Sequence, residues 1–378
     1  MTNNKQYKIC NRCIMDTTDR DIIFDEQGIC NHCRQHDKLY LQLVPEPNEA
    51  EKQLKTLVDR IKEKGKGKKY DCIIGLSGGV DSSYVALLVK KLGLRPLAVH
   101  LDNGWNSELA VQNVENIVNK LNIDLFTIVI NWEEFKDLQL AYLRAGVVDL
   151  EATSDHAIFA SLYKLAKQHD VNFVISGTNV MTESIMPQSW YYGKKDDLTN
   201  LKDIYKKFGS GRKLKSYPMH GFIKLIYFNL FHKLESISIL NYVPYIKSDI
   251  KKTREKELGW RDYGGKHHES LITKFYQCYI LPEKYGIDKR RAHLSNLICS
   301  GQLTREEGLS EIKKPLYLNN AELEKDIEYI IKKFGISRNE FDLIMKGMPK
   351  KHSDFKTDKW LRDAFYNFVA FKNKLLKK

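Results

Sequence analysis

The sequence predicts an α/β protein in which a doubly wound parallel sheet follows a small cysteine-rich unit and precedes a mostly helical region. Short apolar runs alternate with amphipathic stretches between residues 71 and 176, and this alternation is typical of a parallel sheet covered by helices. Four of the seven cysteines fall within the first 33 residues, whereas helical signals prevail beyond residue 190. We therefore expect three units, at residues 1–48, 49–190 and 191–378.

The size and charge of the chain set broad limits on its function. A chain of 378 residues is long for one core, which agrees with two or three units. Its net charge of +13 could serve nucleic acid, a membrane surface or anionic small ligands, but the lysines are spread and a solvated basic surface explains them as well. The most apolar patch, residues 222–231, contains Lys224 and Asn229 and is too short to span a bilayer. We see no signal peptide, so we expect a cytoplasmic protein without a membrane partner.

Two cysteine pairs near the N-terminus predict a metal site. Each pair has the spacing C-x2-C, and sixteen residues separate the pairs. This arrangement lets four thiolates converge tetrahedrally, as a structural zinc ion prefers. An iron–sulfur centre is the alternative, while a disulfide is disfavoured in the expected cytosolic setting. The expected zinc ligands are Cys10, Cys13, Cys30 and Cys33.

The segment between the pairs completes the pattern of a zinc ribbon. Residues 21–28 are typical of a short hairpin with Gly28 at its turn. A unit of this size lacks a hydrophobic core of its own and would fold on the metal. His32 and His36 are close enough in sequence to act as ligands, but four cysteines already complete the shell. We therefore place both histidines on the surface, and we expect a helix near residues 50–63.

A glycine-rich loop carries the clearest chemical signal. Residues 77–83 read Ser-Gly-Gly-Val-Asp-Ser-Ser and lie between the apolar run 71–76 and the amphipathic stretch 84–92. Adjacent glycines let the backbone approach a ligand closely, and the following helix directs free N–H groups and its positive dipole end at the same point. We expect an anion there, although a plain Gly-Ser turn is the alternative. The candidate contacts are Ser77, Gly78, Gly79, Val80, Asp81, Ser82 and Ser83.

The loop lacks the Lys-Ser/Thr ending of the G-x-x-x-x-G-K-[ST] nucleotide-binding loop. It resembles instead the SGGxDS signature of the PP-loop ATP pyrophosphatases, which cleave ATP between the α and β phosphates. This resemblance implies that the loop holds pyrophosphate and that Asp81 helps to place magnesium.

Strands and helices alternate after the loop, as a doubly wound sheet requires. In such sheets ligands lie beyond the carboxyl ends of the strands, so the loops that follow strands are the places to search. Further strands are expected at 95–101, 124–130 and 172–176, and helices at 107–121, 133–144 and 154–169.

By the same resemblance, the loops after two of these strands frame the nucleotide. Residues 100–102 close the second strand, where family members contact adenine largely through main-chain groups, although an ordinary turn is the alternative. Residues 176–179 close a later strand, and a glycine there permits close approach to ATP. Glu183 is a candidate ligand of magnesium or substrate, or else a solvated carboxylate. The candidate nucleotide contacts are His100, Leu101, Asp102, Gly177, Thr178 and Asn179.

Two segments beyond residue 190 carry further chemistry. Residues 190–193 begin an aromatic and basic region that suits stacking on a sugar or base, and equally suits packing. Residues 264–269 read Gly-Gly-Lys-His-His-Glu, in which Lys266, His267 and Glu269 could neutralise polyphosphate or transfer protons. We do not expect the two histidines to share a metal, because adjacent side chains point apart.

Helical signals fill the rest of the chain. Residues 288–291, Asp-Lys-Arg-Arg, open a helix and make Lys289 a candidate catalytic group. Hydrophobic residues spaced along 323–334 indicate an amphipathic helix. Two capping boxes are expected, formed by Thr304 with Glu307 and by Ser337 with Glu340.

Over nearly its whole length the chain resembles the bacterial N-acetyl sugar amidotransferases. The resemblance rests on the cysteine-rich segment at 10–19, the Ser77 loop, the loop at 175–179 and residues 286–291, taken in that order. Other PP-loop enzymes share the individual motifs, but the order and the ribbon sequence are more specific. The resemblance implies a role in building surface glycans such as O-antigens and acetamidino nonulosonic acids, with ATP, Mg²⁺ and Zn²⁺ as cofactors and an acetamido sugar, either free or nucleotide-linked, as substrate.

The implied reaction has a chemical rationale. An amide carbonyl is a poor electrophile, so ATP adenylates the amide oxygen, and ammonia then expels AMP to leave an acetamidino group. The chain has no glutaminase nucleophile motif, and we assign Cys72, Cys278 and Cys299, which lie in apolar contexts, to the core. Ammonia is therefore expected from a separate glutaminase partner, as the resemblance also implies.

Two other functions fit parts of the sequence. A tRNA thiolase uses the same adenylation and carries similar ribbons, and the basic charge favours it. Sulfur transfer needs a persulfide cysteine or clustered cysteines near the phosphate loop, however, and none of the three remaining cysteines forms a C-x-x-C pair. We therefore do not expect nucleic acid as a partner. A nucleotide sensor that binds ATP without releasing pyrophosphate is the third possibility.

Overall fold

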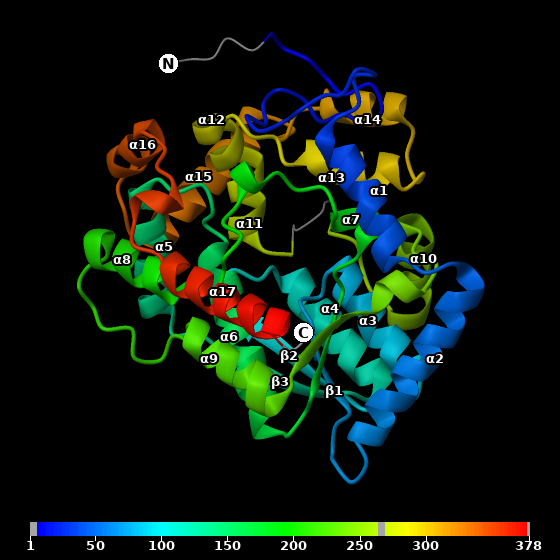
Figure 1. Ribbon diagram of the computed structural model, residues 1–378. Coiled ribbons are helices and arrows are strands. Elements are labelled where there is room, and N and C mark those ends of the chain that lie inside the picture. Colours follow the sequence, from blue (N-terminus) through cyan, green and yellow to red (C-terminus); the bar gives the residue numbers. More distant parts are fainter. Residues whose placement is uncertain (1–5, 264–268, 376–378) are drawn as a thin grey trace.

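The computed structural model describes residues 6–263 and 269–375 (Figure 1). At its centre lies a five-stranded sheet of order β3-β2-β1-β4-β5, in which every neighbouring pair is parallel. Along the chain, β2 and β3 are added on one side of β1, and β4 and β5 are then added on its other side. The winding direction therefore reverses between β1 and β4. The predicted doubly wound sheet is confirmed. Its strands are β1 (Cys72–Gly75), β2 (Pro96–Asp102), β3 (Asp124–Val129), β4 (Phe173–Ser176) and β5 (Glu235–Ser238).

Helices cover both faces of the sheet because successive strand residues point in opposite directions. Ile74 of β1 packs in one core cluster with Ile61 and Ile117, whereas its neighbour Ile73 packs in another cluster with Leu162. The first face is thus covered by α2, α3 and α4, and the second by α6 (Figure 1). The bounds of these helices are α2 (Pro47–Lys64), α3 (Val80–Lys91), α4 (Glu108–Leu121) and α6 (Ala152–Gln168).

The region after residue 190 is mostly helical, as expected, but it also completes the sheet. Strand β5 pairs with β4 at the sheet edge, so the sheet continues past the predicted limit at residue 190. Helices α8 and α15 pack on α5, and the limits of the three units stay a prediction. The remaining helices are α1 (Asn31–Leu43), α5 (Trp132–Ala145), α7 (Val180–Glu183), α8 (Leu198–Phe208), α9 (Phe222–Tyr227), α10 (Lys247–Leu258), α11 (Leu271–Phe275), α12 (Leu281–Tyr285), α13 (Arg290–Cys299), α14 (Arg305–Ile312), α15 (Asn320–Phe334), α16 (Arg338–Lys346) and α17 (Lys359–Leu375).

Local signals explain several helix ends. The capping box at Thr304 is confirmed, since its side chain and that of Glu307 exchange hydrogen bonds with each other's backbone. At α16 only half of the expected box forms: Ser337 accepts the backbone N–H of Glu340 at 3.1 Å. The carboxylate of Glu340 instead pairs with Arg144 at 2.6 Å, which takes it away from the cap. Of the helices in the described part of the chain, none combines the length and the apolar character needed to cross a bilayer.

The N-terminal segment folds as a compact ribbon against α13 and α14 (Figure 1). An antiparallel bridge joins Phe24 to Cys30, and Gly28 between them has φ +75°, so the predicted turn is present as a single bridge. Arg305 donates to the carbonyl oxygens of Cys10 and Cys13 at 3.2 Å. The rest of the chain therefore holds the backbone around the cysteines.

Two sequence expectations around the ribbon are wrong. His36 is only 2% exposed and its Nδ1 lies 2.7 Å from the hydroxyl of Ser184, while His32 is paired with Asp19 at 2.6 Å. Neither histidine is a surface residue, because helix α1 turns them toward the body of the protein. Cys299 packs against the main core cluster, as expected, but its Sγ also lies 3.6 Å from the Sγ of Cys33.

Candidate functional site

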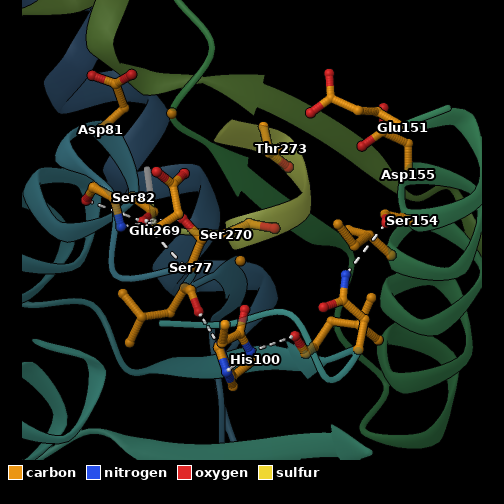
Figure 2. Close-up of a pocket in the computed structure, with 18 of the residues that line it drawn as sticks. Ser77, Asp81, Ser82, His100, Glu151, Ser154, Asp155, Glu269, Ser270 and Thr273 are labelled. Carbon is orange, nitrogen blue, oxygen red and sulfur yellow. Dashed lines mark hydrogen bonds between the residues drawn. The ribbon is translucent and has the colours of Figure 1, made fainter. Parts of the chain in front are cut away.

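A cavity of about 460 Å³ opens at the carboxyl ends of the strands, at the point where the winding reverses. Residues after β1, β2 and β4 line it, together with the first turns of α6 and the segment that leads into α11. Figure 2 shows these groups around the cavity, with Ser77, Asp81 and Ser82 on one side and Glu151, Ser154 and Asp155 on the other. The volume falls within the range of small-molecule sites.

The glycine-rich loop has the shape expected of an anion site. Gly78 adopts φ +80°, and a Cβ at this position would lie 2.6 Å from the carbonyl oxygen of Ala110, so only glycine fits without strain. Trp260 donates its indole N–H to the Gly78 carbonyl at 2.7 Å, and Ser83 donates to the Gly79 carbonyl at 2.6 Å. These bonds fix the loop from behind.

Helix α3 begins directly after the loop and leaves its first N–H groups available to a ligand. Its N-cap residue is Gly79, and no side chain caps the helix. Uncapped N–H groups at the positive end of a twelve-residue helix form a ready binding site for phosphate. Ser77 and Ser82, whose hydroxyl oxygens lie 3.1 Å apart, flank this point and line the cavity.

Carboxylates that could hold magnesium gather beside the loop. Asp81 accepts the hydroxyl of Tyr245, and burial together with this negative charge raises the pKa of the tyrosine. A Cβ on Gly177 would lie 3.1 Å from the Cβ of Asp81, so the glycine allows the β4 loop to approach the phosphate loop. Glu183 and Glu269 also line the cavity. Carboxylate oxygens are the ligands that Mg²⁺ prefers, so these side chains are the candidates to hold the ion, although among the described residues only the four cysteines already form a group of three or more ligands close enough to share one metal.

Glu269 reaches the phosphate loop from the distant segment that the sequence singled out. Its Oε1 would lie 3.3 Å from a Cβ placed on Gly79. Lys266 and His267, predicted from the same segment, lie outside the described residues. Lys289 stands behind the cavity wall, where it pairs with Glu151 at 3.1 Å. The assignment of catalytic roles to these four residues stays a prediction.

The β2 loop is anchored through its histidine. His100 is buried, its Nδ1 lies 2.8 Å from the carbonyl oxygen of Leu76, and its Nε2 lies 3.1 Å from the side-chain nitrogen of Asn106. This pattern fits a neutral ring that donates from Nδ1, and it makes the side chain a support for the loop. His100 and Leu101 line the cavity.

Four predicted contact residues shape the loops without lining the cavity, and one of them is Ser83, whose hydroxyl donates to the Gly79 carbonyl at 2.6 Å. Asp102 accepts the backbone N–H of Gly104 at 2.9 Å, and Asn179 caps α7 by accepting the N–H of Thr182 at 3.0 Å. Gly78 acts through its conformation, as described above. The neighbouring residues Gly177 and Thr178 do line the cavity.

The wall opposite the phosphate loop was not predicted from the sequence. Glu151, Ser154 and Asp155 lie at the start of α6 and line the cavity. Burial raises the pKa of Asp155, and the charge of Lys195 at 2.9 Å opposes this effect. Two carboxylates spaced four residues apart at the start of a predicted helix were the available signal, because such residues share one face.

The cysteine cluster matches a zinc site. The four side chains named from the sequence are fully buried, and their sulfur atoms all lie within 4.8 Å of one another. The sulfur–sulfur distances of 3.6, 3.7 and 3.8 Å agree with the edge of a tetrahedron built from Zn–S bonds of about 2.3 Å. The residues therefore fit a structural zinc ion, which would supply folding energy to this small unit.

Hydrogen bonds connect the cysteine ribbon to the part of the cavity wall that contains Glu183. His36 contacts the Ser184 hydroxyl, and Ser184 donates to Asn296 of α13 at 2.9 Å. Asn296 also accepts the backbone N–H of Ile185 at 2.8 Å. Because Ser184 directly follows Glu183, these bonds hold the magnesium candidate in place.

Comparisons with known proteins match two separate parts of this chain to two protein families. Residues 49–217 match the NAD synthase family, and residues 269–369 match the family described as LPS biosynthesis protein WbpG-like, C-terminal domain. An uncharacterized protein of Methanocaldococcus jannaschii is 22% identical over 313 residues, which cover 81% of this chain and 93% of that protein. The tRNA-specific 2-thiouridylase of Clostridioides difficile is 29% identical but covers only 35% of this chain and 40% of its own length.

Among solved structures, NMN synthetase from Francisella tularensis has a TM-score of 0.35 and 18% identity, covering 81% of this chain and 98% of its own. The NH3-dependent NAD synthetase of Campylobacter jejuni has a TM-score of 0.30 and 21% identity, covering 57% and 89%. The two family matches divide the cavity between them, because one spans the phosphate loop and β1 to β4, and the other begins at Glu269. The chain thus joins a domain that matches the NAD synthase family, and that carries the phosphate loop, to a domain that matches the C-terminal domain of WbpG-like LPS biosynthesis proteins.

Proposed function

We propose that this chain is an ATP-dependent amidotransferase that converts the acetamido group of a sugar into an acetamidino group during synthesis of a bacterial surface polysaccharide or nonulosonic acid. One observation carries the proposal. A single cavity combines the phosphate loop of the NAD synthase-type domain with Glu269, Ser270 and Thr273 of the WbpG-like domain. Nucleotide activation and recognition of a glycan precursor would thus share one site.

The reaction divides into two displacements. The amide oxygen attacks the α-phosphorus of ATP, the bond to the bridging oxygen breaks, and pyrophosphate leaves. Ammonia then adds to the carbon of the resulting O-adenylyl imidate, loses a proton, and expels AMP together with the former amide oxygen. The product has NH in place of O and is one mass unit lighter than the substrate.

The residues of the phosphate loop suit the first displacement. The uncapped N–H groups of α3 would bind the leaving pyrophosphate, where they stabilise charge that grows in the transition state. Ser77 and Ser82 can donate to the same oxygens. Bound Mg²⁺ would neutralise phosphate charge, and Asp81, Glu183 and Glu269 are the side chains available to hold it.

The charge balance of the cavity supports a requirement for divalent metal. Among the described residues, five carboxylates line the cavity but only one lysine, Lys247. The carboxylates are Asp81, Glu151, Asp155, Glu183 and Glu269. A polyphosphate would be repelled by this set without a cation between them. We therefore expect ATP to bind weakly when magnesium is chelated.

The source of ammonia is part of the proposal. None of the seven cysteines lines the cavity, so the chain offers no thiol there for glutamine hydrolysis. A separate glutaminase partner would supply ammonia, and added ammonium should replace it in a purified system.

A tRNA thiolase is the second candidate, because two curated relatives are tRNA-specific 2-thiouridylases. The positions of the cysteines count against it. Cys72 is buried in β1, Cys299 lies against the metal cluster, and Cys278 is absent from the cavity wall. No thiol is placed to carry sulfur to an adenylated base.

The deciding assay measures AMP and pyrophosphate from ATP, Mg²⁺ and ammonium, with either a panel of acetamido sugars or bulk tRNA as acceptor. We expect release that depends on a sugar and on ammonium. The Asp81→Asn variant should abolish it while the exposed variant Asp59→Asn should not. Release that depends on tRNA alone would overturn the proposal.

A further inference from the structure

The cavity has three corners with different chemistry (Figure 2). Ser77, Asp81 and Ser82 form the phosphate corner, and His100 marks the β2 end where the adenine is expected. The third corner, on the far side from Asp81, is formed by the start of α6 and by α11. An acceptor that reacts at the α-phosphorus must approach from a direction that the nucleotide does not fill, and this corner is the one left.

The third corner is built rigidly. Asp155 pairs with Lys195 at 2.9 Å, and Lys195 also pairs with the buried Asp149 at 2.5 Å. Asp149 in turn accepts the backbone N–H of Ala152 at 3.1 Å and thereby fixes the first turn of α6. The side chain of Asp155 is still 38% exposed, so it faces the cavity while the lysine holds it from behind.

Hydroxyl groups stand beside this carboxylate. Ser154 accepts a hydrogen bond from the side chain of Asn103 at 3.3 Å. Thr273 of α11 lines the cavity, and its hydroxyl has no hydrogen-bond partner among the described residues. Thr273 also lies within the WbpG-like match, outside the NAD synthase match, so it belongs to the part of the chain that is specific to the glycan family.

We propose that Asp155, Ser154 and Thr273 form the acceptor subsite, which binds the hydroxyl and amide groups of an N-acetylated hexose. Carboxylates and hydroxyls are the side chains that recognise sugar hydroxyls and amide N–H groups, because a carboxylate only accepts and a hydroxyl both donates and accepts. This inference rests on the proposed function and adds the location and the residues that select the acceptor.

The test measures binding and not turnover. Saturation-transfer NMR would monitor N-acetylglucosamine, N-acetylmannosamine, N-acetylgalactosamine and glucose on the full chain, with Mg²⁺ and α,β-methylene-ATP, which cannot release pyrophosphate. Titration calorimetry would give the affinity for the nucleotide analogue. The variants are Asp155→Asn and Thr273→Val, and their matched controls are Asp59→Asn and Thr56→Val on the exposed face of α2.

We expect at least one N-acetylhexosamine to bind and glucose not to bind. Asp155→Asn should weaken the sugar about tenfold or more, since it removes a charged hydrogen bond, and Thr273→Val about threefold. Nucleotide affinity should stay unchanged. Thr273→Val is the safer variant for folding, because its hydroxyl holds no protein group among the described residues.

Three results would overturn the subsite: unchanged sugar binding in both variants, loss of nucleotide affinity in place of sugar affinity, or no binding of any N-acetylhexosamine to the wild type. Failure of the proposed reaction looks different. In that case a sugar binds and responds to the variants, yet ammonium and ATP release no AMP.

Discussion

Gly78→Ala should be the most damaging single change in the phosphate loop. The residue has φ +80°, a conformation that costs a residue with a Cβ about 1–2 kcal/mol. The new methyl group would also lie 2.6 Å from the backbone carbonyl oxygen of Ala110, which cannot rotate away. Overpacking of this kind adds about 1–3 kcal/mol. We therefore expect a total loss of about 2–5 kcal/mol in the free energy of unfolding.

The chain supplies a matched control for each component of that loss. Gly67 has φ +76°, and a methyl group at this position would have no atom within 4 Å, so Gly67→Ala isolates the backbone cost of about 1–2 kcal/mol. Gly79→Ala has no backbone cost, but its methyl group would lie 3.1 Å from the Ser77 hydroxyl and 3.3 Å from Glu269. It should reduce ATP binding with little effect on stability.

Urea denaturation followed by circular dichroism measures the three stabilities, and calorimetry measures the affinity for α,β-methylene-ATP. We expect the stability order Gly79→Ala, Gly67→Ala, Gly78→Ala, from most to least stable. If Gly78→Ala unfolds at the same urea concentration as Gly67→Ala, the loop does not approach α4 as described, and the account of the anion site fails.

Three further predictions concern the ribbon and a buried histidine. Cys13→Ser should lose the metal and lower the melting temperature, and metal analysis of the wild type should find zinc; a coloured protein that contains iron would refute this assignment. His36→Phe should retain zinc but raise the KM for Mg²⁺ about two- to tenfold through Ser184, whereas Tyr40→Phe, partly exposed on the same helix, should not. His220 is buried with neither ring nitrogen bonded, and burial lowers its pKa to about 4. The unfolded chain therefore binds more protons between pH 6.5 and 4, and stability falls as the pH falls through this window. His220→Phe should flatten the slope of stability against pH by up to about 1.4 kcal/mol per pH unit, and an unchanged slope would contradict the buried neutral ring.

The sequence predicted those parts of the fold that depend on neighbouring residues. β1, the Gly-Gly loop and α3 follow one another within 20 residues, and each has its own local signal. β5 has none, because only Ile237 of its four residues is buried and no alternating pattern results. It becomes a strand through pairing with the open edge of β4, which depends on the tertiary fold.

The missed parts of the site join residues that are far apart in the chain. Tyr245 bonds to Asp81 across 164 positions, and Cys299 meets Cys33 across 266. Asp155 is held on the cavity wall by Lys195, which comes from a separate segment of the chain. No local pattern records such contacts, so the sequence predicted the chemistry of the phosphate corner but not the wall that faces it.

The most direct test of the proposed chemistry follows the amide oxygen. An acetamido sugar that turns over, prepared with ¹⁸O in its acetyl group, would be incubated with ATP, Mg²⁺ and ammonium, and the AMP and sugar products would be analysed by mass spectrometry. Adenylation of the amide oxygen predicts that the label passes to the phosphate of AMP and that the sugar product has lost it. AMP without label would contradict the account, because ATP would then have activated some other group.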